Sequence, residues 1–116
     1  MLSCKSHSQD GITQLTPQVF KDSIAKMDIQ IIDVRTLKEF RAHHIDKAIH
    51  VNFLSEKFQD SIGLLDRAIP VFVYCRSGRR SGKSMTVFKN LEFENIYELE
   101  GGILNWKQAG FEVVSE

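Results

Sequence analysis

Short hydrophobic runs and longer amphipathic stretches alternate along this chain. The apolar runs predict strands over residues 12–15, 29–34, 48–51, 71–74 and 95–99. Between them, apolar residues recur every three or four positions, which predicts helices that begin at Thr16-Pro17 and at Thr36, and helices over 55–65, around 85–91 and over 103–109. Strands that alternate with short helices are typical of a parallel sheet packed between helices, so we expect an α/β fold.

Local signals support two of the helix starts and a single domain. Thr16 and Pro17 suit the cap and the first turn of a helix, and Thr36 and Glu39 match a capping box. Residues 1–11 are polar, and we expect them to form a flexible N-terminal segment. We assign residues 12–116 to one domain, because no linker or repeat interrupts the pattern.

Composition excludes several classes of partner. Fifteen basic residues balance fifteen acidic ones, whereas nucleic-acid-binding domains usually carry a basic excess, so no nucleic-acid partner is expected. No apolar stretch approaches the roughly 20 residues of a membrane-spanning helix. We therefore expect a cytoplasmic protein. The alternative is a cell-envelope lipoprotein whose native N-terminus is trimmed at Cys4, although the apolar run of such a signal is missing.

The most informative stretch runs from the predicted strand 71–74 into a loop that starts at Cys75. Three arginines, Arg76, Arg79 and Arg80, follow this cysteine within five positions. A strand, a tight loop and a helix together aim backbone N–H groups at one point, and the positive end of the helix adds to their effect. Both effects and the nearby guanidinium groups favour the thiolate over the thiol, so Cys75 is the candidate nucleophile. The alternative is a buried cysteine that acts as a small hydrophobic residue.

Three segments resemble the rhodanese family, the thiosulfate sulfurtransferases. The segment Cys75-Arg76-Ser77-Gly78-Arg79-Arg80-Ser81 is similar to the family's active loop. Asp33-Val34-Arg35, with Glu39-Phe40, His44-Ile45 and Ala48, resembles its first signature. Leu99-Glu100-Gly101-Gly102-Ile103, with Trp106 and Gly110, resembles its C-terminal one. The order and spacing of the three make the match specific over nearly the whole chain.

The resemblance implies a single three-layer domain, with a five-stranded, mostly parallel sheet flanked by helices on both faces. It also implies a reaction in which the Cys75 thiolate takes the outer sulfur of thiosulfate and passes it to cyanide or a thiol. No cofactor or metal is implied, because the sulfur travels covalently on the enzyme. A thioredoxin-like or sulfur-carrier protein is a candidate partner. The residues that would bind the substrate and line the loop are Arg76, Ser77, Gly78, Arg79, Arg80 and Ser81.

The chain departs from the family in one turn. The family usually has Gly-His-Ile-Pro-Gly-Ala where this chain has His43-His44-Ile45-Asp46-Lys47-Ala48. A frequent asparagine two positions later is His50. We expect these changes to alter the scaffold around the site more than its chemistry.

Other anion-binding loops fit less well. Phosphatases and arsenate reductases of the same fold have a longer loop, with the phosphate-clamping arginine at the place that Ser81 occupies here. A nucleotide-binding loop of the form Gly-x4-Gly-Lys-Ser is also out of register, because only three residues separate Gly78 from Gly82. A domain that relays sulfur to a partner protein, or that only binds one, is the remaining alternative.

Four other residues have structural interpretations. Asp33 and Arg35 are expected to form an ion pair that supports the sheet edge near the loop, with direct catalysis as the alternative. His43 and His44 are adjacent, so they would not face one metal site, and His44 is expected to make structural hydrogen bonds.

Overall fold

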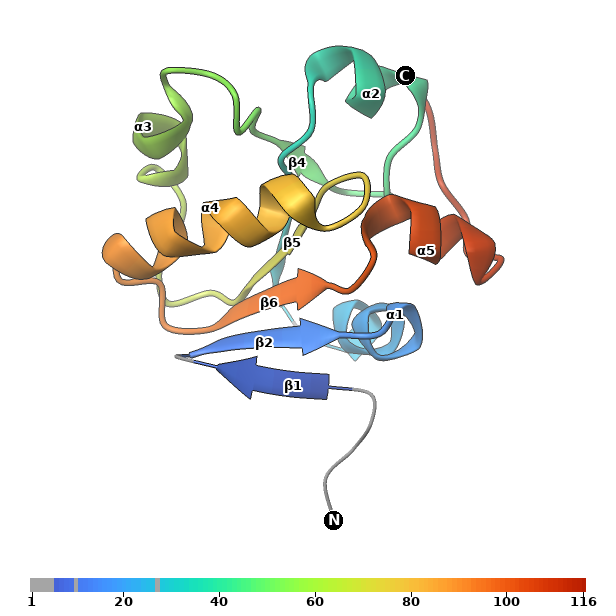
Figure 1. Ribbon diagram of the computed structural model, residues 1–116, viewed down its shortest axis with the longest axis horizontal. Helices are drawn as coiled ribbons and strands as arrows, with labels where there is room; N and C mark the ends of the chain where they lie inside the picture. Colours follow the sequence, from blue (N-terminus) through green and yellow to red (C-terminus); the bar gives the residue numbers. More distant parts are fainter. Residues whose placement is uncertain (1–5, 10, 27) are drawn as a thin grey trace.

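The computed structural model describes residues 6–9, 11–26 and 28–116 as a single sheet with helices on both of its faces (Figure 1). Its strands lie in the order β1-β2-β6-β5-β3-β4. Their bounds are β1 Ser6–Gln9, β2 Ile12–Leu15, β3 Gln30–Asp33, β4 Ile49–His50, β5 Val71–Tyr74 and β6 Ile96–Leu99. All five strands from β2 to β6 pair in parallel, which confirms the predicted fold.

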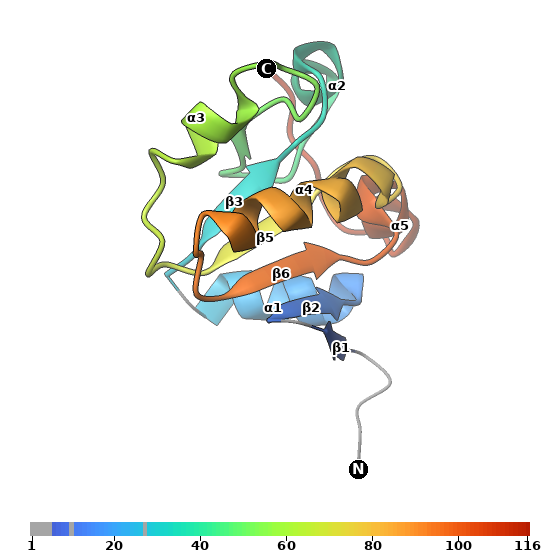
Figure 2. The same ribbon diagram turned by 60° about the vertical axis from the view of Figure 1, so that its left-hand side comes forward.

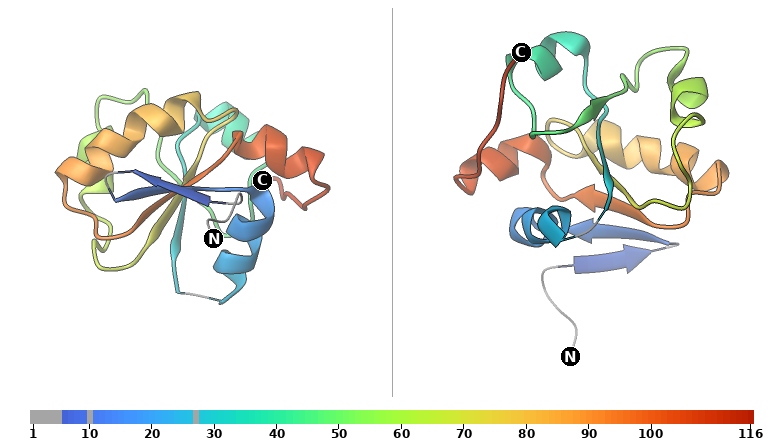
Figure 3. Two further views of the ribbon diagram at one scale, coloured as in Figure 1. Left: turned by 60° about the horizontal axis from the view of Figure 1, so that its bottom comes forward. Right: turned by 180° about the vertical axis from the view of Figure 1, so that it is seen from behind.

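The helices form two layers. Their bounds are α1 Pro17–Lys26, α2 Leu37–Ala42, α3 Phe58–Ile62, α4 Arg79–Asn90 and α5 Gly102–Gln108. Figure 2 shows α4 lying along β5 and β6, and Figure 3 shows α1 on the opposite side of the sheet from α4. The short helix α2 stands beyond the end of the sheet, near the C-terminus of the chain.

Strand β5 supplies both halves of the core because its side chains alternate between the two faces. Val71, Val73 and Cys75 belong to one buried cluster, which α3 and α4 cover through Phe58 and Phe88. The residues between them, Phe72 and Tyr74, belong to a second cluster. This cluster also contains Phe20 of α1 and Trp106 of α5. A strand that is apolar on both sides is expected at the centre of a parallel sheet.

The carboxyl ends of the parallel strands meet at one edge, where ligands bind in folds of this kind. Asp33 ends β3 at this edge, and Cys75 directly follows β5. Helix α2 begins just after β3, and its predicted capping box is present. Thr36 Oγ1 accepts a hydrogen bond from the N–H of Glu39 at 3.3 Å, and Glu39 Oε1 accepts one from the N–H of Thr36 at 3.1 Å.

Strand β1, which the sequence analysis did not predict, adds an antiparallel edge to the five parallel strands. It covers residues 6–9 of the segment that we expected to be flexible, while residues 1–5, with Cys4, and residue 10 lie outside the described part. Gln9 pairs with Ile12, and the sequence between them is Asp10-Gly11. Asp-Gly is a strong hairpin signal, and Gly11 has the required positive φ of 79°.

Helix α3 is shorter than the predicted 55–65. Asn52 and Ser55 bond to nearby backbone instead: Asn52 Oδ1 accepts from the N–H of Leu54 at 2.9 Å, and Ser55 Oγ from that of Lys57 at 3.1 Å. Such side chains offer the backbone an alternative to helical hydrogen bonds, so the helix begins only at Phe58. In the part of the chain that is described, no helix is both long and apolar enough to cross a bilayer.

Candidate active site

The cysteine loop leaves the central strand at the carboxyl edge of the sheet. Gly78 has a φ of 104°, a left-handed conformation that suits glycine, and it turns the chain into α4. The same residue donates its backbone N–H to Cys75 Sγ at 3.1 Å. The N–H groups of the first helical turn have no partners within the helix, so more donors follow directly after Gly78. The arrangement is suited to hold a sulfur anion.

Cys75 is nearly inaccessible, with 1% of its surface exposed. It packs in the same cluster as Val73 and Met85, a burial that the small-hydrophobe interpretation also predicts. The bond from Gly78 is what separates the two interpretations, because a merely space-filling cysteine does not need a main-chain donor aimed at its sulfur. One such bond to Sγ is found among the described residues, whereas we expected the amides of 76–81 to act together.

Arg80 is held by an ion pair that its sequence neighbours do not predict. Its Nη1 and Nη2 donate to Oε1 and Oε2 of Glu39 at 2.6 and 2.9 Å. The hydrogen bond from Arg80 is the main reason that the pKa of Glu39 falls from 4.5 to about 2. Because Glu39 also closes the capping box of α2, one carboxylate joins the starts of α2 and α4. Arg80 therefore has a positioning role in addition to the predicted role in the loop.

Asp33 and Arg35 form the expected ion pair beneath the site. Arg35 Nη2 lies 2.8 Å from Asp33 Oδ2, and the side chains are 2% and 0% exposed. The guanidinium group also donates to the carbonyl oxygen of His43 at 2.6 Å and lies over the ring of Tyr74. Burial, followed by the charge of Asp33, raises the pKa of Tyr74. The pair thus ties the end of β3 to the turn after α2.

A second buried carboxylate holds the first turn of α4 from below. Glu98, which is 4% exposed, accepts a hydrogen bond from Ser81 Oγ at 2.6 Å. Gln14 Nε2 donates to its other oxygen at 3.3 Å. The sequence signal for this contact was a single acidic residue within the otherwise apolar strand β6. Ser81 therefore acts through its side chain as well as by its place in the loop.

Helix α5 closes the other side of the loop. The N–H of Ile103 donates to the carbonyl oxygen of Cys75 at 2.9 Å, and that of Leu104 to the carbonyl oxygen of Arg76 at 3.1 Å. This approach requires glycine at position 102, where φ is 64° and a Cβ would lie 2.7 Å from the Cys75 oxygen. The family-like glycine pair at the start of α5 thus fixes the loop by close packing.

The turn that departs from the family pattern makes hydrogen bonds next to the site. His44 Nδ1 donates to the carbonyl oxygen of Phe40 at 2.8 Å, which confirms its predicted structural role. Lys47 has a φ of 70° at a place where the family usually has glycine. His50 Nε2 donates to the carbonyl oxygen of Arg35 at 2.7 Å. The substituted residues therefore still support the edge of the site.

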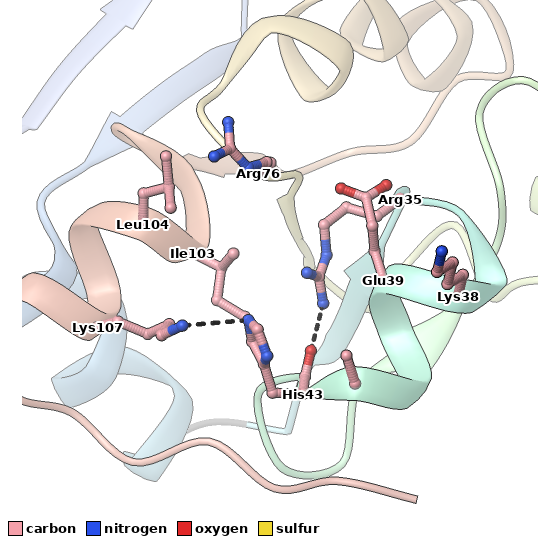
Figure 4. Close-up of a pocket in the computed structure, with 9 residues that line it drawn as sticks. Arg35, Lys38, Glu39, His43, Arg76, Ile103, Leu104 and Lys107 are labelled. Atoms are coloured by element: carbon pink, nitrogen blue, oxygen red, sulfur yellow. Dashed lines mark hydrogen bonds between the residues drawn. The ribbon is translucent and has the colours of Figure 1, made fainter.

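A cavity of about 360 Å³ lies beside the loop, between α2 and α5. Figure 4 shows Arg76 at the loop side of this cavity, Lys107 and Ile103 on α5, and Arg35 and Glu39 opposite them. Arg76 and Arg79 are exposed, as is Ser77. Of the predicted anion-binding arginines, Arg76 thus lines the cavity. Arg79, the first residue of α4, does not line it.

Comparison with known proteins gives a consistent result. A family model described as Rhodanese-like domain matches residues 16–109. A thiosulfate sulfurtransferase GlpE from Shewanella oneidensis is 32% identical over 81 residues, which cover 70% of this chain and 78% of that protein. A tRNA uridine(34) hydroxylase from Anaplasma phagocytophilum is 34% identical over 98 residues, which cover 80% of this chain but only 35% of that protein.

Solved structures show the same fold. A rhodanese-related protein from Thermoplasma volcanium superposes with a TM-score of 0.79 at 25% identity, covering 89% of this chain and 98% of the other.

Proposed function

This chain belongs to the rhodanese-like domain family, and on that premise we propose that it is a sulfurtransferase that moves the outer sulfur of thiosulfate to cyanide or a thiol. Cys75 carries the sulfur as a persulfide. The relative from Shewanella oneidensis is a thiosulfate sulfurtransferase, which supports thiosulfate as the donor. The excess of basic residues around the loop supports an anionic donor of this kind.

The observation that carries the proposal is the bond from the Gly78 N–H to Cys75 Sγ at 3.1 Å. A thiolate held there attacks the outer sulfur of thiosulfate, the S–S bond breaks, and sulfite leaves with the electron pair. The outer sulfur of the resulting persulfide then carries the negative charge. Main-chain donors at the start of α4 stabilise that charge without moving, as preorganised dipoles do in other active sites.

The other residues have supporting roles. Arg76 and Arg79, both exposed at the loop, attract and bind the anionic donor. Glu39 holds the first turn of α4 in place by its ion pair with Arg80. Glu98 holds the same turn by accepting the hydrogen bond from Ser81. Asp33 and Arg35 support the edge of the sheet on which the loop stands.

Mass spectrometry of the intact protein after incubation with thiosulfate tests the proposal. We expect the mass of one sulfur atom to be added, and we expect cyanide to remove it. The chain has two cysteines, so Cys4→Ser is the matched control and should keep the addition, whereas Cys75→Ser should lose it. An addition that persists in Cys75→Ser, or none in the unchanged protein, would refute the assignment.

A sulfur relay to a partner protein is the second candidate. Leu104 lines the cavity beside the loop and is 42% exposed, which suits contact with another protein. In that case Cys75 would accept sulfur from a protein persulfide, and turnover with thiosulfate and cyanide would be negligible.

A further inference from the structure

The cavity between α2 and α5 lies beside the active-site loop. Arg76 lines it, and its α5 wall is joined by hydrogen bonds to the backbone of Cys75 and Arg76. Its volume of about 360 Å³ lies in the range of pockets that hold small organic ligands, about 300–1,000 Å³. A single tetrahedral anion such as thiosulfate would leave most of it unfilled, so the cavity has room for a second, larger reactant.

The lining has an excess of positive charge. Two of its charged residues are already neutralised, because Arg35 pairs with Asp33 and Glu39 pairs with Arg80. The remaining cations are Lys38, Arg76 and Lys107, and the described residues provide no carboxylate partner for any of them. The cavity is therefore complementary to an anionic ligand.

Lys107 is the cation best placed to meet such a ligand. Figure 4 shows it extending from α5 across the cavity towards His43, whose Nε2 accepts its hydrogen bond at 3.3 Å. Burial, and then the charge of Lys107, lowers the pKa of His43, which favours the neutral imidazole. The charge of Lys107 is thus oriented by His43 without being cancelled.

Apolar side chains complete the cavity. Ile103 and Leu104 line it on α5, and Ala42 lines it on α2. A cation beside an apolar wall suits an organic molecule with a short carbon chain that ends in an anionic group.

Building on the proposed function, we propose that the sulfur acceptor is a low-molecular-weight thiol that carries a carboxylate, and that the carboxylate binds Lys107. The acceptor's thiolate attacks the outer sulfur of the Cys75 persulfide. The S–S bond of the enzyme breaks, the Cys75 thiolate leaves with the electron pair, and the acceptor departs as an organic persulfide. The step needs no oxidant or reductant.

Three small thiols of different charge test the proposal: mercaptoacetate is anionic, 2-mercaptoethanol neutral and cysteamine cationic. The rate of sulfur transfer from the purified Cys75 persulfide to each thiol is measured for the unchanged protein, Lys107→Gln and Lys107→Glu. Each thiol has its own reactivity, so the quantity compared is the ratio of the mercaptoacetate rate to the 2-mercaptoethanol rate. Intrinsic reactivity cancels when this ratio is compared between proteins.

We expect the ratio to fall about two- to fivefold in Lys107→Gln, as for one partly exposed ion pair, and further in Lys107→Glu. The corresponding ratio for cysteamine should rise in Lys107→Glu. Lys57→Gln, which removes an exposed lysine outside the cavity, is the control and should change neither ratio. Ratios that stay the same in both Lys107 variants would overturn the proposal.

The persulfide is loaded with thiosulfate in one series and with inorganic polysulfide in another. A failure of thiosulfate alone to load Cys75 would refute the proposed donor, while the polysulfide-loaded protein would still test the acceptor. The two proposals therefore fail in different experiments.

Discussion

Arg80 and Glu39 join the active-site loop to the start of α2 through two parallel hydrogen bonds of 2.6 and 2.9 Å. The two residues are 41 positions apart in the chain. The same carboxylate closes the capping box of α2, so a single side chain determines how the two helix starts face each other. The candidate site depends on this contact for its shape.

Glu39→Gln should weaken both stability and sulfur transfer. The substitution keeps the size of the side chain but removes the charge, so Arg80 is released and the first turn of α4 is held less firmly. We expect a loss of about 1 kcal/mol in the free energy of unfolding, because the pair is partly exposed. Urea denaturation and the rate of cyanide-dependent sulfur release measure the two effects. Glu56→Gln, at an exposed position, should change neither, and equal losses in both variants would contradict the prediction.

The contribution of Glu39 should depend on pH. Its pKa is lowered in the folded protein from 4.5 to about 2, mainly by the hydrogen bond from Arg80. A lowered pKa stabilises the fold above the unfolded-state value, and the stabilisation is lost as the pH falls from about 4.5 towards 2. The difference in unfolding free energy between the unchanged protein and Glu39→Gln should be constant at higher pH and shrink over this interval. A difference that grows on acidification would contradict the assignment.

Removing one partner of the buried ion pair should be costly. Asp33→Asn leaves the guanidinium group of Arg35 buried beside a neutral side chain, and we expect a loss of about 3–5 kcal/mol. The double variant Asp33→Asn with Arg35→Gln should lose less than the sum of the two single variants, because neither charge is then left alone. Urea denaturation of all four proteins measures the coupling. Additive losses would show that the two residues do not act as a pair.

Gly102→Ala should cost more stability than the left-handed backbone conformation alone would explain, because the new Cβ also meets the loop. A Cβ at this position would lie 2.7 Å from the Cys75 oxygen, and φ is 64°. Gly110→Ala is a matched control, because Gly110 has a φ of 85° but no atom within 4 Å of the new Cβ. Both variants should lose about 1–2 kcal/mol for the left-handed conformation, and Gly102→Ala should lose more, together with sulfur transfer. Thermal unfolding and the loading of Cys75 with sulfur distinguish the two effects, and identical behaviour of the variants would rule out the close contact.

Lys47→Gly should stabilise the protein. Lys47 adopts a φ of 70°, which costs a residue with a Cβ about 1–2 kcal/mol. Glycine relieves this strain but has more freedom in the unfolded chain, a cost of about 0.4–1 kcal/mol. We therefore expect a net gain of about 0.5–1 kcal/mol in urea denaturation. A loss of stability would mean that the lysine side chain makes a contact worth more than the strain.

Much of the fold was predictable because its signals are local. The apolar run Val71–Tyr74 identified the central strand, and Thr36 with Glu39 identified the start of α2. The loop after Cys75 could be assigned from its own composition. Strand β1 was missed although the Asp10-Gly11 pair was available as a hairpin signal, because no hydrophobic alternation accompanies it.

The contacts that orient the loop could not be predicted, because each joins distant parts of the chain. Glu39 meets Arg80 and Ser81 meets Glu98 only after the sheet has formed. Nothing in the residues around either carboxylate specifies its partner. Likewise, the side chains of α2 and α5 that share a cavity are separated by the whole central part of the sequence.

Strand β1 also has a consequence for how the domain behaves among copies of itself. Without it, β2 would present a row of open hydrogen-bonding groups to which the strand of another molecule could add. β1 takes that place with the short, entirely hydrophilic sequence Ser-His-Ser-Gln, and the opposite margin is β4, only two residues long. Both margins of the sheet are thus poor templates for intermolecular strand addition, which protects the domain from aggregating edge to edge.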